Sequence, residues 1–398
     1  MMSLRCLAPA LIFAPLLCAA EMPRLKMRAQ TIDTTIQIGY GLAIADVDGD
    51  QRNDIILADA KQVVWYRAPN WEKFILVENL TPKDNVCVAA RDLDGDGKAE
   101  IAVGAEWNPG DTIGSGAVFL LDPPADRTQR WTARKLPHVP TTHRMLWVRS
   151  ADGTFGLAVL PLHGRGNKNG VGDGVELLRY PWPWRTTSVP EPMWSTAAPH
   201  HLTHNFDLLA DRNGGAAESL LVATKEGIRA LNPPGKSAGA TPLNAIAAGE
   251  VRRGTLPGGA NFIATIEPMH GHELAIYRDP VSPQTGTDRT SVDATLTQGH
   301  GLATGDLLGL GGDQVVVGWR GNKPGDKVGI KVYAAADATG TVWTLAGIVD
   351  DNKMAVEDLK IADLNGDGRP DIIAAGRGTK NVVIYWNETE PVKAPGAR

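Results

Sequence analysis

The segment Asp46-Val-Asp48-Gly-Asp50-Gln-Arg52-Asn-Asp54 is the most informative part of the sequence, because its pattern returns at residues 92–100 and 363–371. Each copy has side-chain oxygens at positions 1, 3, 5 and 9 and a backbone carbonyl available at position 7. A tight turn wraps a hard cation such as Ca²⁺ in this way. The expected Ca²⁺ ligands are Asp46, Asp48, Asp50, Arg52 (carbonyl) and Asp54; Asp92, Asp94, Asp96, Lys98 (carbonyl) and Glu100; and Asp363, Asn365, Asp367, Arg369 (carbonyl) and Asp371.

These acidic loops are not EF-hands. Position 12 of an EF-hand needs a bidentate Glu, but it is Leu57, Val103 and Ala374 in the three copies. Each loop also leads into an apolar, mostly β-branched run, such as Ile55-Ile56-Leu57, where an EF-hand would begin a helix. The loops are therefore predicted to join two strands.

The composition narrows the class of protein. The 398 residues carry a net charge of −5 and no basic stripe, which argues against nucleic acid as a partner. There are 44 Gly and 27 Pro residues, and no apolar pattern with a helical period is sustained. This combination favours many turns and little helix.

The N-terminus is typical of a secretory signal. Arg5 precedes an apolar run that ends at Leu17, and Cys18-Ala19-Ala20 is a small-residue cleavage site. The run is too short to span a membrane, so no membrane span is expected. We expect a signal peptide at residues 1–20, a folded domain at 21–387 and a disordered tail at 388–398, in a secreted or periplasmic protein.

Aligning the acidic loops reveals seven units of about fifty residues, a period typical of propeller blades. Each unit has a small-residue strand, a turn and then a buried apolar strand. The apolar strands are expected at residues 54–57, 100–103, 156–160, 219–223, 262–266, 314–317 and 372–373. The last unit lacks a fourth strand, and residues 25–32 can supply it. The prediction is an all-β, seven-bladed β-propeller of four-stranded antiparallel blades, closed by an N-terminal strand; six or eight blades would require a misread third or fifth unit.

All nine histidines lie between residues 138 and 300. The acidic loops mark one end of each blade, so the starts of first strands and the ends of second strands meet at the other end. Three histidines are at the starts of first strands: His143, His204 and His300. Seven polar residues are at the ends of second strands: His163, His270, Arg320, Arg377, Glu106, Asp59 and Lys225. Taken singly, each histidine is more often structural than catalytic. Their shared register predicts a polar site at the channel mouth.

Two resemblances refine this prediction. The acidic loops resemble FG-GAP/VCBS propeller repeats. The motifs Thr142-His143-Arg144, His201-Leu-Thr-His204, Met269-His270-Gly271 and Gly299-His300, in this blade order, resemble the propeller domain of fungal aldos-2-ulose dehydratases, which also act on 1,5-anhydrofructose. Those enzymes eliminate water from keto-sugars. The resemblance therefore implies a carbon–oxygen lyase acting on a carbohydrate.

Elimination needs a base, an acid and an electrophile for the carbonyl oxygen. We expect His143 as base, His204 and His270 as acids or metal ligands, and Arg320 or Arg144 on the oxyanion. The expected substrate-binding residues are His163, His201, His300, Glu106 and Arg377. A second divalent ion (Zn²⁺, Mg²⁺ or Mn²⁺) is considered among the histidines. The alternatives are a non-catalytic carbohydrate- or protein-binding propeller, and a polysaccharide lyase or glycoside hydrolase.

Overall fold

The computed structural model describes residues 22–185, 187–195, 202–209, 217–232, 240–278 and 288–390. The expected signal peptide, residues 391–398 of the expected tail, and His201 lie outside these ranges. Every regular element within them is a strand, and no helix there is long and apolar enough to cross a membrane.

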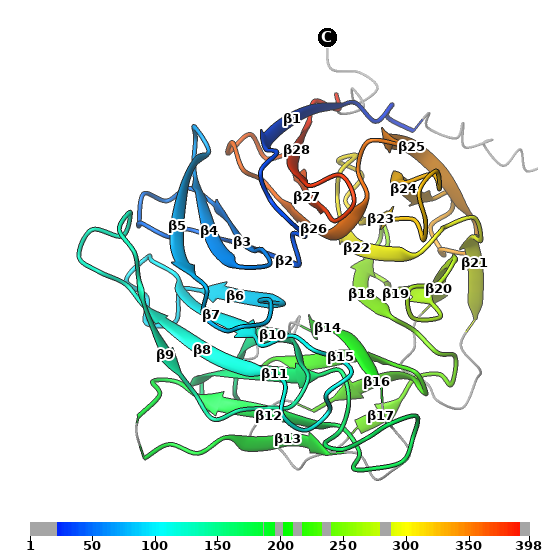
Figure 1. Ribbon diagram of the computed structural model, residues 1–398. Coiled ribbons are helices and arrows are strands. Elements are labelled where there is room, and N and C mark those ends of the chain that lie inside the picture. The colour runs from blue at the N-terminus through cyan, green and yellow to red at the C-terminus, as the bar shows by residue number, and fades with distance from the viewer. Residues whose placement is uncertain are drawn as a thin grey trace, which may run out of the picture.

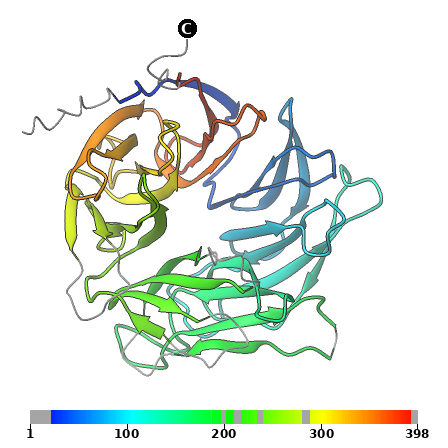
Figure 2. The ribbon, with the colours of Figure 1, turned by 180° about the vertical axis from the view of Figure 1, so that it is seen from behind.

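Seven four-stranded antiparallel sheets surround a central axis, as the two opposite views in Figures 1 and 2 show. This confirms the predicted all-β, seven-bladed propeller. The innermost strands are β2 (Gly41–Ala45), β6 (Cys87–Arg91), β10 (Thr142–Arg149), β14 (Thr203–Leu209), β18 (Glu250–Thr255), β22 (Gly299–Gly305) and β26 (Val356–Ala362). The second strands are β3 (Asp54–Ala58), β7 (Glu100–Ala105), β11 (Phe155–Pro161), β15 (Ser219–Thr224), β19 (Asn261–Glu267), β23 (Gln314–Trp319) and β27 (Asp371–Gly376).

The outer half of each blade follows the same order. The third strands are β4 (Gln62–Arg67), β8 (Ala117–Asp122), β12 (Glu176–Pro181), β16 (Gly227–Leu231), β20 (Glu273–Arg278), β24 (Gly329–Ala335) and β28 (Asn381–Asn387). The outermost are β5 (Glu72–Glu78), β9 (Thr132–Lys135), β13 (Glu191–Ser195), β17 (Ala240–Pro242), β21 (Arg289–Asp293), β25 (Trp343–Asp351) and β1 (Met27–Asp33).

The N-terminal strand closes the ring. β1 pairs antiparallel with β28, with Ala29 opposite Tyr385, so the first strand of the chain completes the last blade. This matches the strand expected at residues 25–32. The pairing continues beyond β28, where Glu388 N donates to Lys26 O and Lys26 N donates to Thr389 Oγ1.

The core lies between neighbouring blades. Second strands such as β3 and β27 are buried along their whole length, since another sheet covers each of their faces. One apolar cluster joins Ile56 and Trp65 of the first blade to Val88 and Ile101 of the second. Such layers around the ring hold the inner strands, and hence the channel mouth, in fixed positions.

Several strands in the weaker repeats could not be predicted from the sequence. In the fourth unit β14 begins at Thr203, so His204 lies at the start of a first strand, as expected. In the fifth unit the inner strand β18 had no visible signal. The outer strands β13, β17 and β21 were also missed; they are short and bury few side chains, so they show little apolar pattern.

Candidate active site

Four inner strands each have a β-bulge that places a polar side chain at the channel mouth. The strand-pair register shifts at the second residue of β10, β14, β22 and β26. The residues at these β-bulges are His143, His204, His300 and Glu357. A bulge bends its strand and re-aims the extra side chain, and bulges are frequent next to active sites. In the inner strands β2, β6 and β18 the pairing with the second strand has no shift.

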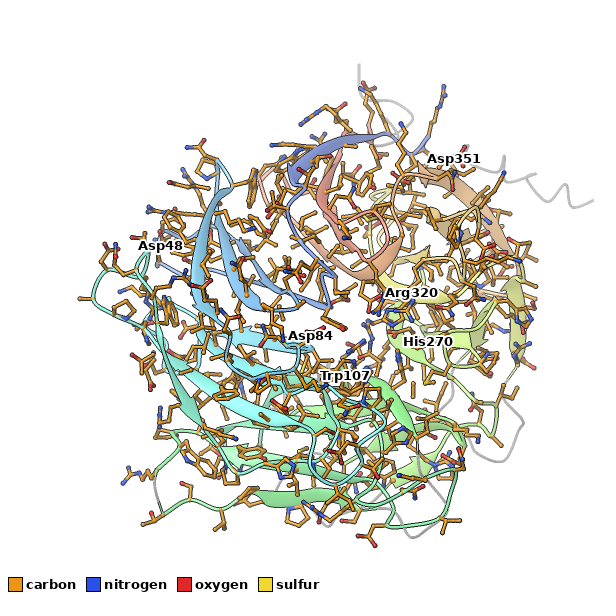
Figure 3. All side chains as sticks on the ribbon, in the orientation of Figure 1. Asp48, Asp84, Trp107, His270, Arg320 and Asp351 are labelled. Carbon is orange, nitrogen blue, oxygen red and sulfur yellow. The ribbon has the colours of Figure 1, made fainter. Side chains whose placement is uncertain are left out.

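These side chains line one cavity of about 210 Å³. Its lining residues are Tyr40, Val86, Trp107, Pro109, His143, Arg144, Leu162, His204, Met269, His270, His300, Arg320, Glu357 and Arg377. Trp107, His270 and Arg320 lie around the central axis in Figure 3. Seven of the predicted site residues therefore come together: His143, Arg144, His204, His270, His300, Arg320 and Arg377.

His204 is held in one tautomer. Its Nδ1 donates to Gly249 O at 3.0 Å and lies 3.1 Å from Glu250 Oε1. The ring and the Glu250 carboxylate are both buried. Protonation at Nδ1 leaves the lone pair on Nε2, which lies 2.8 Å from His270 Nε2. His300 is oriented in the same way, because its Nδ1 donates to Glu357 O.

His204, His270 and His300 could hold a metal ion. Each offers a ring nitrogen, and the three nitrogens lie within 4.8 Å of one another. Two of the rings have the tautomer that a ligand needs, and a carboxylate behind a ligating histidine is a usual second partner. Tetrahedral Zn–N bonds separate two ligand nitrogens by about 3.3 Å, so His204 and His270, now 2.8 Å apart, would move by about half an ångström. The residues therefore fit a divalent ion after a small adjustment.

Glu357 links two arginines at the rim. Its Oε1 accepts from Arg377 Nη1 at 3.0 Å, and its Oε2 accepts from Arg320 Nη1. Arg320 also donates through Nε to Gln298 Oε1 at 3.0 Å and places Nη2 3.5 Å from His270 Nδ1. Both guanidinium groups are thus fixed at the cavity wall.

His143 lies between an aromatic ring and a cation. Its ring stacks on Trp107, with centroids 4.9 Å apart, and Arg144 Nη1 donates to its Nε2 at 3.1 Å. Burial, followed by the charge of Arg144, lowers the pKa of His143 well below its usual value. Burial and neighbouring positive groups likewise lower the pKa of His300, and lower that of His270 to about 2. These imidazoles are neutral at pH 7.

Some predicted residues lie elsewhere. His163 lines a separate cavity of about 130 Å³ with His138, Arg165 and Asp173. Glu106 is not among the residues that line the central cavity. Asp59 has a structural role, because its carboxylate accepts hydrogen bonds from the backbone N–H groups of residues 37, 38 and 39.

Sequence reasoning missed four residues of this region: Glu357, Glu250, Trp107 and Tyr40. A signal existed for Glu357, which is the second residue of its inner strand exactly as His143, His204 and His300 are. No such signal existed for Trp107, which follows the second strand of its blade and stacks on His143 of the next blade.

The acidic loops lie at the opposite end of the strands, because Ala45 pairs with Asp54 while Gly41 pairs with Ala58. The carboxylates of Asp46, Asp48 and Asp50 form one cluster, and those of Asp92, Asp94 and Asp96 form another. The position-9 carboxylates are bonded to backbone amides: Asp54 accepts from Val47 N and Ala68 N, Glu100 from Leu93 N, and Asp371 from Leu364 N and Asn387 N. Burial raises the pKa of Asp54 and Glu100 to about 7 and that of Asp371 to about 6.

Comparison with known proteins supports the repeat assignment. A sequence family described as the FG-GAP-like repeat matches residues 46–103, and the FG-GAP repeat family matches residues 88–121. The chain thus contains FG-GAP repeats that include its first two acidic loops. No curated protein matches the chain.

Two solved structures illustrate the fold. One chain of the mitotic checkpoint complex is 12% identical with a TM-score of 0.55, over 97% of this chain and 98% of that one. A chain from the structure of BBS1N in complex with ARL6DN is 13% identical with a TM-score of 0.56, over 94% of this chain and 99% of that one. At such identities the likeness concerns the fold alone.

Proposed function

We propose that this FG-GAP-repeat propeller is a carbohydrate dehydratase, which removes water from a keto-sugar by β-elimination. One observation carries the proposal: four histidines, three arginines and one carboxylate from five blades converge on a single cavity of about 210 Å³. Acid, base and oxyanion-stabilising groups are what this reaction needs in one place. The proposal agrees with the resemblance of the histidine motifs to aldos-2-ulose dehydratases.

In the substrate the reaction breaks one C–H and one C–O bond and forms one C=C bond. The base removes the proton from the carbon next to the carbonyl, a C=C bond forms, and the β-hydroxyl leaves as water after taking a proton from the acid. We assign the base to neutral His143, and the imidazolium that it becomes then acts as the acid, because His270 is neutral at pH 7. His143 Nε2 now accepts from Arg144 Nη1, so Arg144 must turn toward the substrate before that lone pair can take a proton.

The enolate oxygen needs positive charge near it. Arg144 and Arg320 both line the cavity and remain charged. His204, His270 and His300 would be the residues that hold a divalent ion, and such an ion would polarise the substrate carbonyl. His270 would then be a ligand, and His143 would still be the residue that takes the proton and returns it to the leaving hydroxyl.

A glycoside hydrolase is less well supported. Inverting and retaining hydrolases use two facing carboxyl groups. Glu357 is the only carboxylate among the described residues that line the cavity, and two arginines already bind it. Sugar binding without chemistry uses the same cavity, so the experiment below separates the two functions.

The test is an ultraviolet assay for the conjugated carbonyl product, run with keto-sugars and uronides on purified wild-type protein. His143→Ala should lower kcat by about 10²- to 10⁴-fold, the usual contribution of a general acid or base, while the circular dichroism spectrum stays unchanged. The matched control is His138→Ala, because His138 bonds Ser115 O in the neighbouring cavity and does not line the site; its kcat should equal that of wild type. Sugar binding with no product from any substrate would favour the non-catalytic propeller.

A further inference from the structure

Arg144 lies where two cavities meet. It lines the active-site cavity and also a second cavity of about 210 Å³, which is lined by inner strands of the ring. Its Nη1 donates to His143 Nε2 at 3.1 Å and to His143 O at 3.0 Å. Within the described part of the chain, its Nε and Nη2 donate no hydrogen bond and its guanidinium forms no ion pair.

The other cations of both cavities have carboxylate partners. Arg320 and Arg377 share Glu357. In the second cavity, Arg252 lies 3.7 Å from Glu250, and Lys360 lies 3.0 Å from Asp358. The remaining carboxylate there, Asp207, accepts the backbone N–H of residue 253 and interacts with Arg252 and Lys360. Among the charged side chains that line these cavities, Arg144 is therefore the cation left without a counter-charge.

A partly buried guanidinium without a counter-charge is costly, because it has lost water and gained no anion. Its Nε and Nη2 form one edge of a planar fork, which matches the two oxygens of a carboxylate. A ligand in the active-site cavity can supply that carboxylate, since Arg144 lines the cavity beside His143 and His204.

We propose that the substrate is a sugar carboxylate, a keto-sugar acid or uronate, whose carboxylate pairs with Nε and Nη2 of Arg144. The sugar part of this inference rests on the proposed function; the carboxylate part rests on Arg144 alone. The cavity of about 210 Å³ is below the range of about 300–1,000 Å³ for drug-sized ligands. We therefore expect a monosaccharide unit in it.

The experiment compares two probes that differ only in the carboxylate, D-glucuronate and D-glucose, by isothermal titration calorimetry with the full-length protein. Wild type should bind glucuronate at least about ten-fold more tightly than glucose, the gain from one charge-assisted contact. Arg144→Gln should remove this preference, because it should weaken glucuronate binding at least about ten-fold more than glucose binding. Arg144→Lys should restore part of it, since an ammonium group keeps the charge but not the fork.

The matched control is Lys360→Gln, which removes a cation of the second cavity that Asp358 already neutralises. It should change the preference for glucuronate by less than about three-fold. Each variant is first checked for a wild-type melting temperature. Equal affinity of wild type for the two probes, no glucuronate binding, or an unchanged preference in Arg144→Gln would overturn the inference.

Binding and turnover separate this inference from the proposed function. A carboxylate preference that depends on Arg144, without product from any sugar, would support the inference and contradict the dehydratase proposal. Elimination from a neutral keto-sugar with the same kcat/KM as from its acid counterpart would support the dehydratase proposal and contradict the carboxylate inference.

Discussion

Glu357 joins two blades through a single carboxylate. It lies in β26 of the last blade, where it binds Arg377 from the end of β27, and it reaches Arg320 beyond β23 of the sixth blade. The Glu357 carboxylate is buried and the Arg320 guanidinium nearly so, with side-chain exposures of 4% and 11%, whereas Arg377 is 43% exposed. The pair with Arg320 should therefore matter more for stability than the pair with Arg377.

Glu357→Gln should lower the free energy of unfolding by about 2–4 kcal/mol, because it leaves a buried guanidinium without its counter-charge. Urea unfolding followed by tryptophan fluorescence measures this change. Arg377→Gln is the control and should cost less than about 1 kcal/mol, since that arginine is largely solvated. Equal losses in the two variants would contradict this account.

At the scale of elements, an aspartate at the end of an outermost strand fastens that strand to the next blade. At the end of β1, Asp33 accepts from Tyr66 Oη at 2.6 Å and from Lys73 Nζ at 2.7 Å. The end of β21 repeats the arrangement: Asp293 accepts from Tyr333 and Lys331. In β1 the contact also helps to close the ring.

The pKa of Asp33 predicts how this contact responds to acid. Burial alone raises it, but hydrogen bonds from Lys73, Thr35 and Tyr66 lower it from 3.8 to about 2. A folded-state pKa below the unfolded value adds stability above about pH 4, and this contribution is lost as the pH falls from about 4 to 2.

Asp33→Asn should therefore be less stable than wild type by about 1–2 kcal/mol at pH 7. The difference should shrink toward zero near pH 2. Urea unfolding at several pH values tests this, with Asp122→Asn as control, because Asp122 forms an exposed pair with Arg134 and should change stability by less than about 1 kcal/mol. A difference between wild type and Asp33→Asn that does not vary with pH would contradict the assignment.

Across the whole molecule, the acidic loops of the last, first and second blades touch one another. Asn53 Nδ2 donates to Asp363 O, and Ala99 N donates to Asp46 O. A cation bound in any of these loops would thus stiffen the part of the ring where the chain closes. We expect Ca²⁺ to bind there, as the loop spacing predicts.

Adding Ca²⁺ to protein freed of metal with EDTA should raise the melting temperature, because a ligand that binds only the folded state stabilises it by about 2.7 kcal/mol at a concentration of 100 Kd. Asp94→Asn should reduce the rise. Asp152→Asn, an exposed turn residue outside the acidic loops, should leave it unchanged. A melting temperature that does not respond to Ca²⁺ would contradict the expectation.

Much of the fold was predictable because it rests on local patterns that repeat. The loop at residues 46–54 and the apolar strand that follows it recur with enough regularity to indicate seven blades. The polar residues at first-strand starts indicated that their side chains lie at one end of the channel, where His143, His204 and His300 share a cavity. The outer strands β13, β17 and β21 were not predictable, since they bury few side chains and their pattern is weak.

What the sequence determined by itself was the all-β propeller, its closure by an N-terminal strand, and the end of the channel at which His143, His204, His270 and His300 gather. Which side chains share a cavity depends on the packing of the blades and could be seen only in the folded protein. The tertiary structure added Glu357 and Trp107, placed His163 in a separate cavity, and left Arg144 without a counter-charge. The physical reason is that strand patterns are local, whereas contacts across the channel depend on bulges and on the packing of blades distant in sequence.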